Sequence, residues 1–258
     1  MPDCPERPPD HGSDPVIPPD HPRYRSLITR ERLARCAKEG VVAMEGLTAH
    51  GRGEAFDYLI GERTTDSALL AEQTAAAMLL AATHPVISVN GNTAALAAKE
   101  IAELQKACGA IVEVNLFHRT EARVAQIEKI LSDAGADVFS GEAEQLLPLS
   151  HDRAWCRREG MYTADVVLVP LEDGDRCEAL VGMGKKVIAI DLNPLSRTAR
   201  KATLTVVDEV TRALPAIAQA CHDLSDADKS RLLSTLDNHY LLSEAIREIT
   251  ARLSHALD

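Results

Sequence analysis

The spacing of hydrophobic positions divides the chain at Pro85. Before this residue, apolar side chains recur every three or four positions over Tyr24–Lys38 and over Asp66–Ala82. That spacing is typical of helices that bury one face, and Asp66 or Ser67 can cap the second stretch. The pattern therefore predicts two helices ahead of any strand.

After Pro85, short β-branched runs alternate with amphipathic stretches. Runs that are apolar on both faces are typical of parallel strands covered by helices on each side. The predicted strands are Val86–Val89, Ile111–Leu116, Ala136–Phe139, Asp165–Val169, Val187–Asp191 and Leu204–Val207. Helices are predicted between strands over Thr93–Ala107, Glu121–Ala134 and Asp175–Met183, and beyond them over Glu209–Cys221, Asp226–Leu236 and Tyr240–Leu257.

This alternation predicts an α/β fold. We expect a doubly wound, mostly parallel Rossmann-like sheet, with helices on both faces and extra N- and C-terminal helices. A length of 258 residues suits one such domain. Eight of the 13 prolines fall between Pro2 and Pro22, in a stretch with almost no aliphatic residues. Residues 1–20 are therefore predicted to be a proline-rich, disordered arm, followed by a single domain over residues 21–258.

Composition and charge exclude several classes of function. With 28 Lys+Arg against 39 Asp+Glu, the net charge of −11 argues against binding nucleic acid or anionic membranes. No apolar run is long enough to span a membrane, and the first residues lack the pattern of a secretory signal, so we expect a cytoplasmic protein. Its six cysteines are scattered without a CxxC pair, which favours reduced thiols and no structural metal.

Small polar or charged groups follow four of the predicted strands. They are Asn90-Gly91-Asn92-Thr93, Phe117-His118-Arg119-Thr120, Glu172-Asp173-Gly174-Asp175-Arg176 and the segment Asp191–Thr198. Helix capping and turn formation account for each loop alone, but four such loops at one sheet end indicate a ligand site. No GxGxxG follows a strand and no GxxxxGK[ST] occurs, which disfavours a dinucleotide site and a P-loop.

Two further segments carry candidate anion-binding groups. Arg52 is flanked by glycines, which suits a turn where the backbone approaches a ligand and the guanidinium grips phosphate. A glycine-rich turn in which Arg52 pairs with Glu54 or Asp57 is an equal alternative. The neighbouring His50 is either a general base or a structural hydrogen-bonding group. Arg197, close behind a strand end in this acidic chain, favours a polyanion.

Read together, these stretches resemble the archaeal phosphopantothenate synthetase family, the 4-phosphopantoate–β-alanine ligases of coenzyme A biosynthesis. The resemblance covers about residues 17–215 and rests on long strings: AHGRGEAFDYLIGERT, HPVISVNGNTAAL, EVNLFHRTEARV, VPLEDGDR and IDLNPLSRTAR. It implies an enzyme that joins the carboxylate of 4-phosphopantoate to the amine of β-alanine while ATP is converted to AMP and diphosphate. An acyl-adenylate intermediate, Mg²⁺ on the triphosphate and a homodimer are implied in the same way.

The resemblance also implies site residues. For ATP it implies Arg30, Arg52, Asp191, Leu192, Asn193, Arg197, Thr198, Asp208 and Glu209. For phosphopantoate we predict Asn90, Asn92, Asn115 and Arg119 from their positions at strand ends, and we assign catalytic roles to Arg52 and His50. Helices Ser67–Ala82 and Tyr240–Leu257 are candidates for the dimer interface.

Two alternatives stay open on the sequence. One is a different enzyme on the same architecture, such as a nucleotide-dependent kinase or a dehydrogenase, because a fold alone does not determine function. The other is a non-enzymatic module that binds ATP without consuming it. Formation of ADP, hydride transfer or the absence of ATP consumption would distinguish them.

Overall fold

The protein is described by a computed structural model that covers residues 17–150 and 152–255. Five parallel strands form its central sheet, in the order β2-β1-β5-β6-β7. They are β1 (Pro85–Val89), β2 (Ile111–Val114), β5 (Val166–Pro170), β6 (Lys186–Ile190) and β7 (Leu204–Val206). The order reverses between β1 and β5, because β2 lies on one side of β1 while β5, β6 and β7 follow on the other. The predicted parallel α/β sheet is confirmed.

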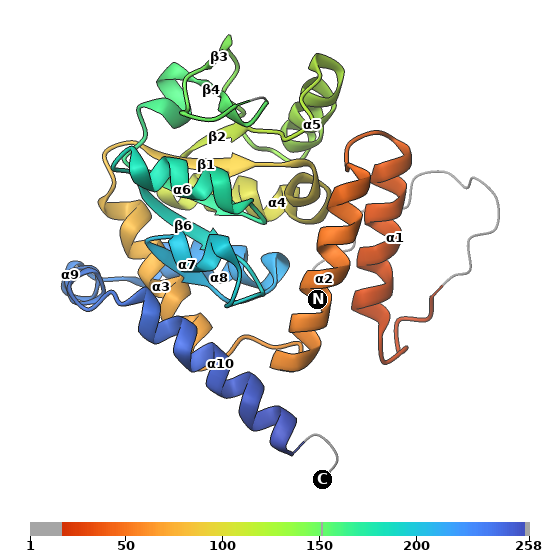
Figure 1. Ribbon diagram of the computed structural model, residues 1–258, viewed down its shortest axis with the longest axis vertical. Coiled ribbons are helices and arrows are strands. Elements are labelled where there is room, and N and C mark those ends of the chain that lie inside the picture. The colour runs from red at the N-terminus through yellow and green to blue at the C-terminus, as the bar shows by residue number, and fades with distance from the viewer. Residues whose placement is uncertain (1–16, 151, 256–258) are drawn as a thin grey trace.

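The helices cover the sheet on both faces (Figure 1). One face carries α3 (Asp66–Ala81), α4 (Gly91–Cys108), α5 (Glu121–Asp133) and α8 (Val210–Asp223). The other carries α6 (Gly174–Gly182) and α7 (Arg197–Lys201). The remaining helices are α1 (Tyr24–Lys38), α2 (Met44–Ile60), α9 (Asp226–Ser234) and α10 (Asn238–Ser254), and a 3-10 turn (Asp152–Ala154) and a π-helical turn (Arg158–Tyr162) lie beside the short hairpin of β3 (Ala143–Gln145) and β4 (Trp155–Arg157).

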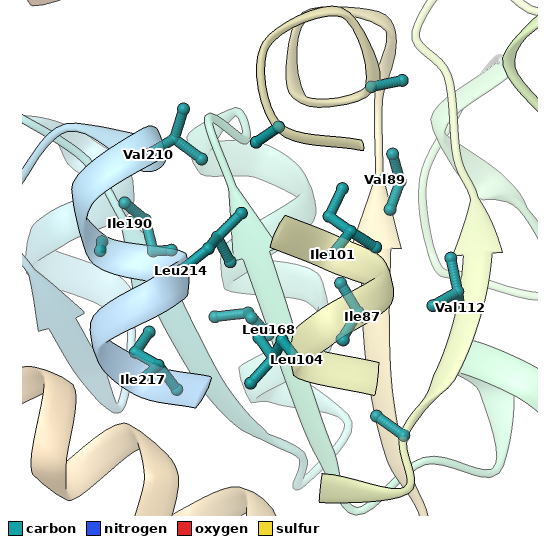
Figure 2. Close-up of a cluster of buried hydrophobic side chains, with 14 of the residues drawn as sticks. Ile87, Val89, Ile101, Leu104, Val112, Leu168, Ile190, Val210, Leu214 and Ile217 are labelled. Carbon is teal, nitrogen blue, oxygen red and sulfur yellow. The ribbon is translucent and has the colours of Figure 1, made fainter. Parts of the chain in front are cut away.

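Alternation of side chains along the strands explains the two faces. In β5, Val166 and Leu168 point to the core under α4 and α8, whereas Val167 and Val169 point to the core under α6. Successive strand residues face opposite sides, so a strand buried on both sides is apolar throughout. Figure 2 shows the first core, where helices α4 and α8 pack against the sheet; its labelled members are Ile87, Val89, Ile101, Leu104, Val112, Leu168, Ile190, Val210, Leu214 and Ile217.

The predicted strand Ala136–Phe139 is wrong. Only Val138 pairs with the sheet, in an isolated parallel bridge to Val112. At Asp137 the backbone N–H donates to the side chain of Gln105 (2.8 Å) and the carbonyl accepts from the same side chain (2.7 Å). A side chain of α4 therefore satisfies the backbone groups that a strand ladder would have used.

The predicted glycine-rich turn around Arg52 is also wrong, because these residues lie inside helix α2. Gly51 and Gly53 weaken a helix by about 0.5–1 kcal/mol each relative to alanine. Packing compensates for this cost: Ile60 is buried, and α2 ends at Gly61, whose φ of 100° is easy for glycine. Tertiary contacts thus override the local signal for a turn.

The other predicted helices are confirmed with small shifts at their ends. The hairpin β3–β4 and helix α7 have no counterpart in the sequence prediction. Most of the predicted arm, residues 1–16, and the last residues of the predicted C-terminal helix lie outside the described residues. The single domain over residues 21–258 stays a prediction.

Candidate active site

A cavity of about 940 Å³ lies between the carboxyl ends of the strands and the helix pair α1–α2. Figure 1 shows α1 and α2 side by side at one edge of the fold. The sheet contributes the residues that follow all five strands, and the helix pair contributes residues from Arg25 to Glu62. The cavity therefore lies where the strand order reverses, the usual ligand-binding position in an open parallel sheet.

Two asparagines on the sheet wall are bonded to other segments of the protein. Asn90 caps α4 by accepting from the backbone N–H of Thr93 (3.0 Å), and its amide donates to the carbonyls of Pro170 and Leu171 (both 3.1 Å). Asn92 donates to the carbonyl of Gly46 in α2 (2.8 Å). These contacts connect β1 with β5, and the sheet with the helix pair.

Asn115 follows β2 and is buried with a buried arginine. Its side-chain oxygen accepts from Nη2 of Arg176 (2.7 Å), and its amide donates to Ser88 Oγ (3.3 Å). Arg176 is 1% exposed and also donates to the carbonyl of Trp155 (3.2 Å). Its Nε lies 4.0 Å from the carboxylate of Glu172, another cavity residue. Asn115 and Arg176 therefore link the cavity wall to the β3–β4 hairpin.

The loop after β6 forms a compact polar turn. Asp191 accepts from the backbone N–H of Asn193 (2.9 Å) and from the hydroxyl of Ser196 (2.5 Å). Leu192 is buried beside it, and the hydroxyl of Thr198 donates to the carbonyl of Glu172 (2.9 Å). The turn thus presents a carboxylate and an amide to the cavity on a bonded support.

Asp208 and Glu209 follow β7. Asp208 is buried and accepts from Nε of Arg212 (2.8 Å), the hydroxyl of Thr64 (2.5 Å) and the backbone N–H of Glu209 (2.7 Å). Arg212 also pairs with Asp57 of α2 (2.5 Å). Glu209 caps α8 by accepting from the backbone N–H of Thr211 (2.7 Å). This end of the cavity is held by charged hydrogen bonds, the stronger kind.

The helix wall carries cations without protein partners. Arg25 and Arg52 are exposed and line the cavity, and their guanidinium groups make no hydrogen bond or ion pair with any residue in 17–150 or 152–255. The charge of Arg52 favours the ionised form of Asp191, so the two groups lie near each other across the cavity. Arg30 differs, because Glu54 binds its Nε (3.0 Å) and Nη2 (2.7 Å).

His50 and three carboxyl groups have shifted pKa values. Burial lowers the pKa of His50, and the charge of Glu54 opposes this effect. Burial raises the pKa of Glu172, Asp191 and Glu209, and nearby arginines and hydrogen bonds to the carboxylates counter part of the shift. The cavity is therefore a place where charge is costly until an oppositely charged ligand arrives.

Basic groups also gather at the β1–β2 end. Arg123 of α5 donates to the carbonyls of Val41 (3.0 Å) and His118 (2.9 Å), and it pairs with no carboxylate in the part of the chain that the structure describes. Arg153 lies with its guanidinium 4.2 Å from the ring centroid of Phe117 and pairs with Asp175 (2.6 Å). Arginines thus line both ends of the cavity, an arrangement that suits a ligand or ligand pair with several anionic groups.

Comparison with known proteins points to ligand chemistry of the same kind. A family profile described as phosphopantothenate/pantothenate synthetase matches residues 67–252. A relative from Methanospirillum hungatei, named 4-phosphopantoate–β-alanine ligase, is 59% identical over 243 residues, which make up 94% of this chain and 100% of the relative. Relatives of the same name from Methanosarcina mazei and Thermococcus kodakarensis are 54% and 49% identical; each match covers 92% of this chain, with 95% and 94% of the respective relative.

The chain belongs to the phosphopantothenate/pantothenate synthetase family. The family resemblance found in the sequence is therefore confirmed. In this synthetase-family fold, the cavity collects most of the residues that the sequence singled out. Those that line it are His50, Arg52, Asn90, Asn92, Asn115, Asp191, Leu192, Asn193, Arg197, Thr198 and Glu209.

Three predicted residues lie behind the cavity wall. Arg30 contacts the cavity through Glu54, and Asp208 contacts it through Arg212. Arg119 is half-buried, and its backbone N–H donates to Asp152 (3.0 Å).

Arg197 lines the cavity, but its guanidinium is already paired. Its partners are the carboxylates of Asp175 and Glu178 on α6. A ligand phosphate at Arg197 would therefore compete with these two carboxylates.

Sequence reasoning missed four arginines of the cavity: Arg25, Arg123, Arg153 and Arg212. Arg25 and Arg123 lie on surfaces of predicted helices that a single sequence does not orient toward a site. Arg153 and Arg212 lie in or beside elements whose packing brings distant segments together. Among the residues that the structure describes, no group of three or more His, Cys, Asp or Glu is placed to hold a metal ion, and no helix is long and apolar enough to cross a membrane.

Proposed function

We propose that this chain is an ATP-dependent amide ligase that joins the carboxylate of 4-phosphopantoate to the amine of β-alanine and yields 4′-phosphopantothenate, in coenzyme A biosynthesis. The observation that carries the proposal is the 59% identity to a relative named 4-phosphopantoate–β-alanine ligase, over the whole length of that relative. The cavity supports it, because unpartnered arginines face a polar strand-end wall that can take several anionic groups.

The proposed reaction converts ATP to AMP and diphosphate through an acyl-adenylate. A phosphopantoate carboxylate oxygen attacks the α-phosphorus and diphosphate leaves; the β-alanine amine then attacks the acyl carbon, AMP leaves with the C–O electron pair, and the amine loses a proton. In this scheme the protein has to gather mutually repelling anions and stabilise charge on the leaving phosphates. Such work suits Arg52, which has no ion-pair partner to give up among the described residues.

We assign the β6–β7 end of the cavity to ATP. Asp191, Leu192, Asn193, Thr198 and Glu209 would hold the nucleoside, with Arg52 and Arg197 on the phosphates. Arg30 and Asp208 would act through Glu54 and Arg212. A carboxylate at a strand end, as at Asp191, is a common partner of ribose hydroxyls.

We assign the β1–β2 end to phosphopantoate, through Asn90, Asn92 and Asn115. Their side-chain amides are already bonded within the protein, so their contribution is to shape the wall, with Arg119 behind it. His50, whose pKa is lowered, would be neutral at pH 7 and able to accept a proton from the β-alanine ammonium.

Magnesium and assembly complete the proposal. We propose that Mg²⁺ enters on the triphosphate, the usual way this ion is held in nucleotide sites. The acidic groups Glu172 and Asp173 on the wall are suitable oxygen donors toward such an ion. We also propose a cytoplasmic homodimer through α3 and α10, which expose Leu69 and Tyr240. Sedimentation as a particle of about 28 kDa, the mass of one chain, would contradict the dimer.

Product analysis by phosphorus NMR tests the function. The protein is incubated with ATP, Mg²⁺, 4-phosphopantoate and β-alanine, and each component is then omitted in turn. AMP and diphosphate formed only in the complete mixture are expected. ADP and phosphate would overturn the adenylate mechanism, and no consumption of ATP would overturn the ligase.

A further inference from the structure

Glu72 is a buried acidic residue with no role in the site described so far. It lies in the middle of α3 and is 0% exposed. Neither of its carboxylate oxygens accepts a hydrogen bond from an N–H or O–H donor of residues 17–150 or 152–255. An ionised carboxylate in such surroundings would be strongly destabilised, since burial removes its water and nothing replaces it.

The neighbour of Glu72 is a second carboxylate, that of Asp208, to which it hydrogen-bonds. Two ionised carboxylates accept hydrogen bonds and cannot donate one, so a hydrogen bond between them requires a proton on one of the two. Asp208 receives N–H or O–H donors from Arg212, Thr64 and Glu209. Glu72 receives none from the described residues. The proton therefore belongs on Glu72.

The charge balance of the cluster leads to the same assignment. Three carboxyl groups, those of Asp57, Asp208 and Glu72, surround the single guanidinium of Arg212. The charged groups that act on Glu72 itself are Asp208, which follows β7, and Arg212 of α8. Burial and the negative charge of Asp208 raise the pKa of Glu72 to about 9, and Arg212 opposes the shift.

We infer that Glu72 is a neutral carboxylic acid at pH 7 and a positioning residue for the nucleotide end of the cavity. Its proton lets it donate to Asp208. Asp208 in turn holds Arg212, which lines the cavity, and accepts from the backbone N–H of Glu209, next to the start of α8. If Glu72 lost its proton, repulsion between the two carboxylates would displace Asp208 and disturb these contacts. The inference rests on the proposed function in assigning ATP to this end.

A carbon-13 NMR titration of the glutamate carboxyl groups in the whole wild-type protein tests the protonation directly. One signal should titrate near the Glu72 pKa of about 9. This signal should vanish in Glu72→Gln, which keeps the size of the side chain and an N–H donor toward Asp208. It should persist in Glu103→Gln, a control that alters an exposed glutamate of α4. A Glu72 signal titrating near the ordinary value of about 4.3 would overturn the inference.

The dissociation constant of ATP tests the positioning role. It is measured without β-alanine, whose amine titrates in the same range as other amines. Between one pH unit below and one above the Glu72 pKa, the wild-type constant should rise up to about tenfold, since one pKa unit corresponds to a factor of ten. In Glu72→Gln it should stay level, and in Glu103→Gln it should follow the wild type.

The two tests separate this inference from the proposed function. Parallel rises in the wild type and Glu72→Gln would overturn the positioning role. Failure of the wild-type protein to bind ATP at any pH would overturn the proposed function instead. The NMR titration involves no substrate, and it would then decide the protonation of Glu72 by itself.

Discussion

The two walls of the cavity differ in how far their polar groups are already bonded within the protein. On the sheet wall, Asn90 and Asn115 use both ends of their amides in hydrogen bonds to other groups of the protein. On the helix wall, Arg25 and Arg52 have no partner among the described residues. A group that is bonded in the free protein contributes to stability, whereas an unpartnered group can respond to a ligand. We therefore expect changes on the sheet wall to affect folding and changes on the helix wall to affect turnover.

Arg52→Ala gives the largest expected effect. Removing an unpartnered cation that meets developing negative charge should lower turnover by about 10²–10³-fold. The free energy of unfolding should stay close to that of the wild type, because Arg52 is exposed and bonds to no described residue. Steady-state kinetics and urea unfolding measure the two quantities. Arg35→Ala, which removes an exposed arginine of α1 outside the cavity, is the control; equal turnover in both variants would exclude Arg52 from the site.

Asn115→Ala tests the opposite wall. The change leaves Nη2 of the buried Arg176 without the side-chain oxygen that it contacts at 2.7 Å. Loss of a buried hydrogen bond to a charged group should lower the free energy of unfolding by about 2–3 kcal/mol. Urea denaturation is the measurement. A variant as stable as the wild type, with its activity lost, would place Asn115 on the functional side of the comparison and contradict the distinction between the walls.

Two glycines of α2 test how the walls are joined. A Cβ at Gly46 would clash with Oδ1 of Asn92, so Gly46→Ala must push the sheet and the helix pair apart. We expect a loss of about 1–3 kcal/mol in the free energy of unfolding. Gly51→Ala is the matched control in the same helix, because a Cβ there meets nothing within 4 Å. It should stabilise the protein by about 0.5–1 kcal/mol. Thermal unfolding that ranks the two variants the other way would contradict this packing.

The same contrast explains what the sequence could predict. Strands β1, β5 and β6 are apolar on both faces, and their burial makes this local pattern decisive. Topology then places the loops after these strands together, so the cluster of Asn90, Asp191 and Asn193 was predictable as a cluster. Helix α2 was not, because two glycines favour a turn locally and only packing against distant segments stabilises the helix.

Partners far apart in the chain were equally hidden. The bonds from Asn90 to Pro170 and Leu171, and from Thr64 to Asp208, join residues that no local spacing relates. Glu72 lies in a stretch so rich in Ala and Leu that it predicts only a buried helix. Its carboxylic acid gains meaning only when folding brings Asp208 beside it. Sequence thus predicts which loops meet, and three-dimensional packing decides which side chains remain free.

His50 gives the smallest expected effect, and it concerns pH. Because burial lowers its pKa in the folded protein, the unfolded chain binds a proton more readily. Stability that is present above the unfolded pKa of about 6.5 is therefore lost as the pH falls through the two pKa values. The charge of Glu54 favours protonated His50 and that of Arg30 opposes it, so the effect should stay small.

His50→Gln should remove this acid-induced loss of stability, whereas His239→Gln, at an exposed position of α10, should retain it. Urea unfolding at neutral and mildly acidic pH measures the difference. The comparison matters because His50 stands on the helix wall, where most polar groups are expected to serve the ligand. A loss that survives in His50→Gln would show that the folded protein takes up this proton elsewhere, and the neutral form of His50 would then contribute nothing to the pH dependence of folding.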